Sequence, residues 1–120
     1  MYWKQKGPEN TENVAKLAIE KAKELQIKHI VVASNSGNTV RHFLDKGLEI
    51  ICVTHHVGFM TPGEDEMPAA VRQELTEKGV KILTTTHLMA GLDRALRMKF
   101  GGVYPAEIIA STLRMLGQGV

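Results

Sequence analysis

The chain has 120 residues, of which 43% are hydrophobic and 23% are charged. These values are close to globular averages, so they exclude a disordered tail, a fibrous repeat and a low-complexity linker. Lys and Arg total 15 against 13 acidic residues, and no run of like charges stands out. We therefore expect neither nucleic acid nor a membrane as a partner, and we expect residues 1–120 to form a single domain.

The amino-terminal residues lack the apolar stretch of a secretory signal, and no window is long and apolar enough to span a membrane. A cytoplasmic location is expected on that basis. The single cysteine, Cys52, excludes an intrachain disulfide and lies inside an apolar run. The sequence predicts that Cys52 is an inert, buried thiol.

Hydrophobic periodicity predicts an alternation of helices with short β-rich runs. In chain order, the elements are a short strand at Tyr2–Lys4, a helix at Thr11–Gln26, a strand at Ile30–Ala33, a helix at Thr39–Lys46, a strand at Ile50–Thr54, a helix at Pro68–Lys78, a strand at Val80–Thr84, a helix carrying Leu88, Leu92, Ala95 and Leu96, and a helix that begins at Pro105 and carries Ile108, Ile109, Leu113 and Leu116 before Gly117. This alternation predicts an α/β fold, a three-layer α/β/α arrangement around a mostly parallel sheet. Ligands of such sheets bind at the carboxyl ends of the strands, near the point where strand order reverses.

A polar loop with one glycine follows the first predicted strand of the sheet and leads into a helix. Its residues are Ser34, Asn35, Ser36, Gly37, Asn38 and Thr39. Backbone N–H groups near a glycine, together with hydroxyl donors, are what a phosphate group needs. The loop therefore predicts a phosphate site. Replacement of Gly37 by valine is expected to abolish the binding of phosphate-bearing ligands and to leave the fold largely intact. The alternative is an ordinary helix start capped by Asn38 or Thr39.

Further candidates for ligand contact stand at or shortly after the ends of the next two predicted strands. They are three histidines, a threonine and a phenylalanine: His55, His56, His87, Thr54 and Phe59. One of His55 and His56 is predicted to contact a ligand, or else to be a histidine hydrogen-bonded at a strand terminus. Neighbours on an extended chain point to opposite sides, so these two do not easily share one ion and no metal site is predicted. Residues 57–67, with an acidic run at 64–66, are predicted to form an exposed, mobile cover.

The motifs of several enzyme classes do not occur. There is no nucleophile elbow, no pair of carboxylates flanking a site, no GxGxxG and no GxxxxGK[ST]. The absence of these motifs speaks against a dinucleotide-dependent oxidoreductase and against a nucleotide triphosphatase. No catalytic residue is assigned, and whether the chain is an enzyme stays open.

Four segments carry a resemblance to a known family: Glu9–Glu12, Ile27–Asn38, Ile51–Phe59 and Phe100–Glu107. The chain resembles small stand-alone proteins that are similar to the carboxyl-terminal α/β domain of pyruvate kinase. That domain carries no catalysis, and its matching loop binds a phosphate of the sugar bisphosphate activator. The resemblance implies a phosphate role for Ser34, Ser36, Gly37 and Thr39.

The same resemblance bears on the extent of the chain. Members of the stand-alone family continue into further strands that complete the sheet, so we expect this chain to be incomplete at its carboxyl-terminal edge, as a natural short form or a fragment. We also expect a homo-oligomer, or a second chain that completes the sheet.

Residues Ser34–Thr39 also resemble the flavodoxin phosphate loop, [ST]-x-[ST]-G-x-T. That resemblance implies flavin mononucleotide (FMN) as an alternative cofactor, with Phe59, His55 or His56 beside the flavin ring. The leading hypothesis is a binding or regulatory domain for a small phosphorylated ligand, a sugar phosphate or a nucleotide. An FMN-binding flavoprotein or enzyme and a structural subunit without a ligand are the alternatives.

Overall fold

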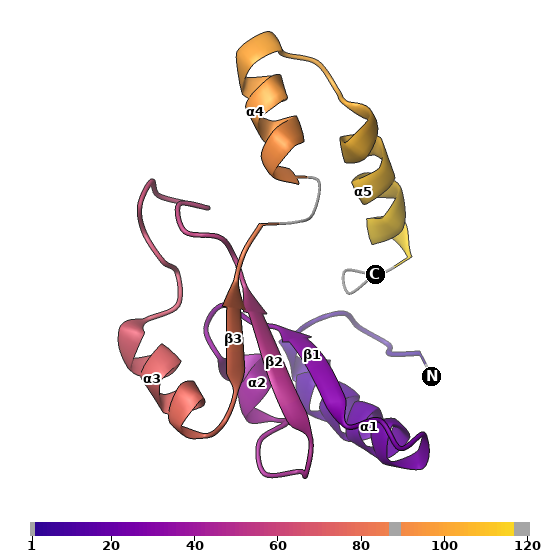
Figure 1. Cartoon of the computed structure of the whole chain (residues 1–120). Coiled ribbons are helices and arrows are strands. Elements are labelled where there is room, and N and C mark those ends of the chain that lie inside the picture. Colours follow the sequence, from indigo (N-terminus) through magenta and orange to yellow (C-terminus); the bar gives the residue numbers. More distant parts are fainter. Residues whose placement is uncertain (1, 87–89, 117–120) are drawn as a thin grey trace. The chain divides into compact units, whose positions relative to one another are not determined.

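The computed structural model describes residues 2–86 and 90–116. The chain divides into two compact units, the first ending at Thr84 and the second beginning at Thr85 (Figure 1). The predictions for His87, Leu88 and Gly117 fall outside the described residues. The prediction of a single domain stays a prediction.

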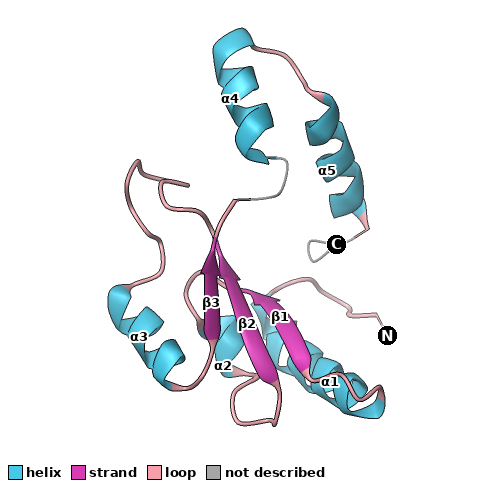
Figure 2. Ribbon diagram, in the orientation of Figure 1, coloured by secondary structure: helices cyan, strands magenta, loops and turns pink. Residues whose placement is uncertain are grey.

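The first unit is a parallel sheet with helices in its crossovers (Figure 2). Its elements are η1 (Pro8–Asn10), α1 (Thr11–Glu24), β1 (His29–Ala33), α2 (Asn38–Arg41), β2 (Glu49–Thr54), α3 (Ala69–Glu77) and β3 (Lys81–Thr84). The described strands stand in the order β1-β2-β3, with Val32 paired to Cys52 and Cys52 paired to Ile82. The predicted α/β class with a parallel sheet is confirmed. Within these three strands the order does not reverse.

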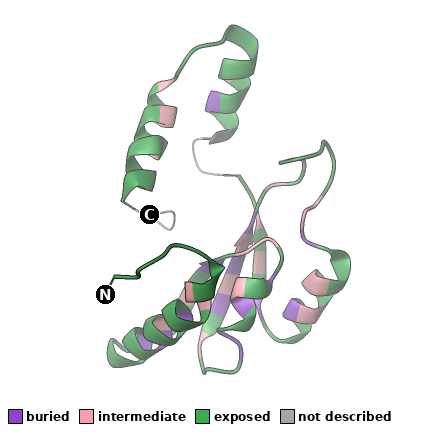
Figure 3. Ribbon diagram, turned by 180° about the vertical axis from the view of Figure 1, so that it is seen from behind, coloured by how far each residue is buried: buried purple, intermediate pink, exposed green. Residues whose placement is uncertain are grey.

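One face of the sheet carries the core. Burial alternates along the strands, since Val32 and Cys52 are buried whereas Val31 is 70% exposed (Figure 3). The helices contribute Ile19, Val40 and Leu75 to the same hydrophobic cluster. Helices of the first unit thus cover a single face. The second helical layer of the predicted three-layer arrangement stays a prediction.

Two helices of the first unit end in the same way, at a residue with positive φ. Gly79 has φ 81° after α3, and Val80 N–H donates to Leu75 O at 3.0 Å. Gln26 has φ 56° after α1, and Ile27 N–H donates to Ala22 O at 2.8 Å. This left-handed ending satisfies carbonyls that the last helical turn leaves without a partner. It turns the chain into the following strand.

Two predicted elements differ from the structure. Residues 2–4 form no strand, and Tyr2 is fully exposed. The predicted helix Thr39–Lys46 is an α-helix only over Asn38–Arg41. His42 N–H and Phe43 N–H donate to the carbonyls three residues earlier, and Asp45 has φ 59°, so turns replace the remaining helix. Phe43 and Leu44, which lie in these turns, are nevertheless buried, as is Val40 within α2. Turns can thus present apolar side chains to the core as a helix does.

The second unit contains α4 (Ala90–Phe100) and α5 (Pro105–Met115), as the sequence predicted. Tyr104 Oη donates to Leu96 O at 3.3 Å, and Arg97 Nη1 donates to Glu107 Oε1 at 3.1 Å, so the two helices are tied to each other. Across residues 2–86 and 90–116, no helix has the length and apolar character needed to cross a membrane.

Candidate functional site

The loop between β1 and α2 lies at the carboxyl end of the sheet. Ser34 N–H donates to Val53 O at 3.0 Å and continues the strand pairing. Gly37 then takes the left-handed conformation, with φ 78°, directly before α2. Ser36 Oγ accepts a long hydrogen bond of 3.4 Å from Asn38 N–H. In the part of the chain that is described, the N–H groups of Thr39 and Val40 have no acceptor. At the carboxyl end of the sheet, the loop thus has two backbone N–H groups without an acceptor among the described residues, and the predicted phosphate site stays a prediction.

Gly37 packs against α3. A Cβ atom there would lie 2.8 Å from Val71 Cγ1 and 3.2 Å from Leu75 Cδ1. On the side of Gly37 where a Cβ atom would lie, the space is therefore filled by side chains of α3. The expectation that valine at Gly37 leaves the fold largely intact is wrong, because its side chain would collide with α3.

Asn35 and His55 meet Glu66 and form a hydrogen-bonded cluster. His55 N–H donates to Asn35 Oδ1 at 2.7 Å, which joins the two strand ends. Asn35 Nδ2 donates to Glu66 Oε2 at 2.9 Å, and His55 Nδ1 lies 2.5 Å from the same oxygen. The sequence predicted Asn35 for phosphate and His55 for a ligand, but it did not predict Glu66. The acidic side chain arrives from a loop 11 residues further along the chain, and no spacing rule indicates that contact.

Aromatic rings pack beside this cluster. The rings of His55 and Phe59 are tilted by 34° with centroids 4.0 Å apart. The ring of His56 meets Phe59 edge-on at 5.6 Å. Phe59 therefore contacts both imidazoles, although the two histidines are adjacent on an extended chain.

Thr54 belongs to a second polar network at the strand ends. Arg72 Nη2 donates to Thr84 Oγ1, which lies 2.8 Å from Thr54 Oγ1. Thr54 Oγ1 donates in turn to His55 O at 3.2 Å. Each hydroxyl has one hydrogen, so the geometry fits a chain running from Arg72 through Thr84 and Thr54 to the backbone of His55. Thr54 is 4% exposed, and its hydroxyl hydrogen is used within the protein.

The acidic run of residues 64–66 is only partly exposed. Asp65 accepts hydrogen bonds from Met67 N–H at 3.0 Å and from Arg72 Nη2 at 2.6 Å. These two partners, the N–H group first, lower the pKa of the Asp65 carboxyl. Met67 is 2% exposed and belongs to the core. The end of the predicted cover is thus anchored, contrary to the expected exposure of the whole segment.

The model of the family described as pyruvate kinase, alpha/beta domain, matches residues 12–120. The chain belongs to this family. The resemblance inferred from the sequence is confirmed.

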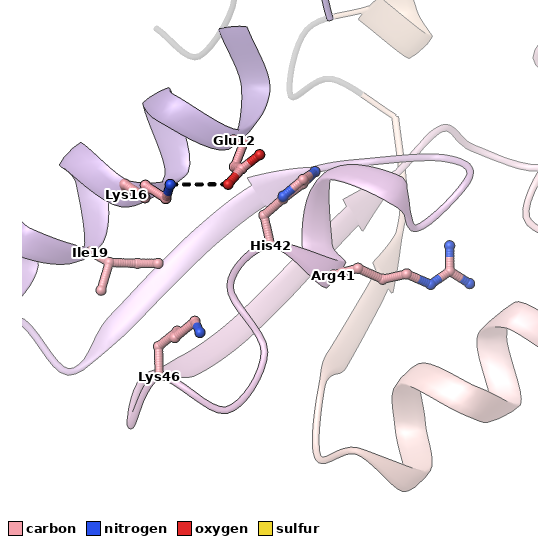
Figure 4. A pocket seen from close by; sticks show the side chains of 6 residues that line it. All are labelled: Glu12, Lys16, Ile19, Arg41, His42 and Lys46. Carbon is pink, nitrogen blue, oxygen red and sulfur yellow. Dashed lines mark ion pairs between the residues drawn. The ribbon is translucent and has the colours of Figure 1, made fainter. Parts of the chain in front are cut away.

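This member of the pyruvate kinase α/β domain family also has a pocket that the sequence did not predict. It has a volume of about 260 Å³ and is lined by residues of α1, of α2 and of the turns after α2: Glu12, Lys16, Ile19, Arg41, His42 and Lys46 (Figure 4). Lys16 pairs with Glu12 at 3.0 Å, and this hydrogen bond lowers the pKa of the Glu12 carboxyl. The Arg41 guanidinium points away from that pair and binds Glu74 at 2.7 Å. Two of the pocket's cations are therefore neutralised by carboxylates.

Cys52 provides a direct check of the core beneath the site. It is 0% exposed, its Sγ–H donates to Ser34 O at 3.3 Å, and burial raises the pKa of its thiol. We expect iodoacetamide to alkylate Cys52 in the native protein on the order of 100-fold more slowly than in the urea-unfolded chain, because only the exposed thiolate reacts. Mass spectrometry measures both rates. Equal rates would show that Cys52 is accessible in the native state.

Proposed function

We propose that the chain is a binding or regulatory domain that holds a small phosphorylated ligand, a sugar phosphate or a nucleotide, at residues 34–39. The observation that supports the proposal is the pair of N–H groups at Thr39 and Val40 that lack an acceptor within the described residues. Such donors at the start of a helical turn favour an anionic oxygen. The hydroxyls of Ser34, Ser36 and Thr39 add further donors.

The sequence predicted all six residues of the loop, 34–39, as ligand contacts, but we assign them different roles. Asn35 is held by His55 and Glu66, and Gly37 packs against α3. Both therefore shape the loop, whereas the backbone and the hydroxyls bind the ligand. Because α2 has only 4 residues, its dipole adds little to the affinity. Each hydrogen bond to a charged oxygen contributes roughly 1.5–3 kcal/mol.

Replacement of Thr39 by alanine tests the proposal. We expect the affinity for glycerol 3-phosphate to fall on the order of tenfold, because one hydroxyl donor to a charged oxygen is lost. Thr39→Ser retains that hydroxyl and should bind nearly as well as wild type. The measurement is a titration followed by NMR, which reports on the amides of Thr39 and Val40 at constant ionic strength.

Thr76→Ala is the matched control, since Thr76 is exposed on α3 and its hydroxyl donates to Arg72 O within the same helix. It should leave the affinity unchanged. Absence of any shift at the loop amides of the wild-type protein would contradict phosphate binding. The loop would then serve only to start α2.

FMN remains the second candidate because aromatic rings lie beside the loop. The His55 and Phe59 rings are 4.0 Å apart, and Asn35 ties His55 to the loop. An isoalloxazine ring would stack on such side chains. Titration with FMN, followed by its visible absorbance, distinguishes the two ligands. Preference for FMN over glycerol 3-phosphate at residues 34–39 would favour a flavoprotein.

A further inference from the structure

The pocket between α1 and the turns after α2 shares no lining residue with the loop of the proposed function, residues 34–39 (Figure 4). Most of its lining side chains are basic, and one is a carboxylate: Lys16, Arg41, His42 and Lys46, with Glu12 and the apolar Ile19. Pockets that hold drug-sized ligands have volumes of roughly 300–1,000 Å³. The volume here is about 260 Å³, so the pocket suits a smaller molecule.

The cations of this pocket differ in how far the protein itself engages them. The Arg41 guanidinium is bound by Glu74 at 2.7 Å. Glu12 accepts one of the three hydrogens of Lys16 Nζ, at 3.0 Å. Lys46, by contrast, forms no ion pair within residues 2–86 and 90–116. The ammonium group of Lys46 is therefore available to an anion from solution.

The other lining residues restrict what kind of anion fits. Ile19 is 8% exposed and belongs to the hydrophobic core cluster, so one part of the wall is apolar and fixed. The hydrogen bond from Lys16 and then its charge lower the pKa of the Glu12 carboxyl, which is therefore ionised at neutral pH. This carboxylate repels a second negative charge on a ligand. The pocket thus favours a singly charged anion with an apolar part.

We propose that the pocket binds a small monocarboxylic acid, with its carboxylate on Lys46 Nζ and its hydrocarbon part on Ile19. The carboxylate accepts charge-assisted hydrogen bonds from the ammonium group. The hydrocarbon part leaves water when it covers the exposed edge of Ile19. This site is separate from the proposed phosphate site, and neither depends on the other.

Titration of the full chain with butyrate, followed by NMR at the Ile19 methyl groups and the His42 ring, tests the proposal. At neutral pH and constant ionic strength, butyrate should bind about two- to fivefold more tightly than butyramide, which has the same carbon chain without the charge. It should exceed acetate, which has a shorter chain, by a similar factor. Butyrate binding no tighter than that of either analogue would overturn the proposal, as would the absence of shifts at Ile19 and His42.

Variants of exposed lysines test the assignment of the anion to Lys46. Lys46→Gln should lower the affinity for butyrate about two- to fivefold, whereas Lys46→Arg keeps the charge and should retain most of it. Lys28→Gln is the matched control, because Lys28 is exposed and does not line the pocket. It removes the same unit of charge and should leave the affinity unchanged. Equal effects of Lys46→Gln and Lys28→Gln would overturn the contact with Lys46.

Propyl phosphate tests the class of anion. It carries a short hydrocarbon chain and close to two negative charges at neutral pH, so repulsion by Glu12 should keep its affinity for the pocket at or below that of butyrate. Tighter binding of propyl phosphate, with shifts at Ile19 and His42, would overturn the carboxylate class. Shifts at the amides of Thr39 and Val40 report on the proposed phosphate site instead, so the two sites are tested separately.

Discussion

Replacement of Gly37 by alanine is expected to lower the free energy of unfolding by about 2–4 kcal/mol. Two costs add up at this position. Gly37 has φ 78°, which disfavours any L side chain, and its Cβ would lie 2.8 Å from Val71 Cγ1 on α3. The first cost is about 1–2 kcal/mol and the second is the overpacking of a filled core. Urea unfolding followed by circular dichroism measures the sum.

Gly79→Ala separates the two costs. Gly79 has φ 81°, but a Cβ atom added there would meet nothing within 4 Å, so only the conformational cost of about 1–2 kcal/mol is expected. Val71→Ala should lessen the effect of alanine at Gly37, because it removes the atom that the new Cβ meets. Equal losses for Gly37→Ala and Gly79→Ala would contradict the close packing of the loop on α3.

Replacement of Leu75 by alanine is expected to cost about 2–5 kcal/mol of stability. Leu75 is 0% exposed and belongs to the same cluster as Val40 and Cys52, so truncation leaves a cavity under the loop. Thermal and urea unfolding measure the loss. Leu25→Ala is the control: Leu25 is 55% exposed, and less than about 1 kcal/mol is expected there. A loss at Leu75 no larger than that at Leu25 would show that α3 is not packed as the structure has it.

These two expectations also bear on ligand binding. Gly37→Ala disturbs the loop by pushing it away from α3, so a loss of phosphate binding in that variant would not by itself identify a ligand contact. Thr39→Ala and Thr39→Ser avoid this problem, because neither adds volume. Variants of Thr39 therefore test the site, and variants of Gly37 test the scaffold.

Local sequence patterns determined most of the secondary structure and the place of the candidate site. Alternating apolar runs predicted β1, β2 and β3, and periodic helical patterns predicted α1 and α3 to within a few residues. Parallel strands place their carboxyl ends at one edge, so the polar loop at residues 34–39 and His55 were expected at the same edge. These inferences hold because they depend on neighbours in sequence or on the general geometry of βαβ units.

Only the tertiary structure decided which residues those loops contact. The apolar spacing of Val40, Phe43 and Leu44 is compatible with a helix or with turns, and in the structure the α-helix ends at Arg41 and turns follow it. The sequence explained Gly37 by the close approach of an anion, yet in the structure Gly37 also packs against α3, where a Cβ atom would lie 2.8 Å from Val71 Cγ1. Glu66 looked like part of an exposed acidic run, yet its carboxylate binds Asn35 and His55. Such contacts join residues that are far apart in the sequence, and no periodic pattern encodes them, because they depend on how separate elements pack together in space.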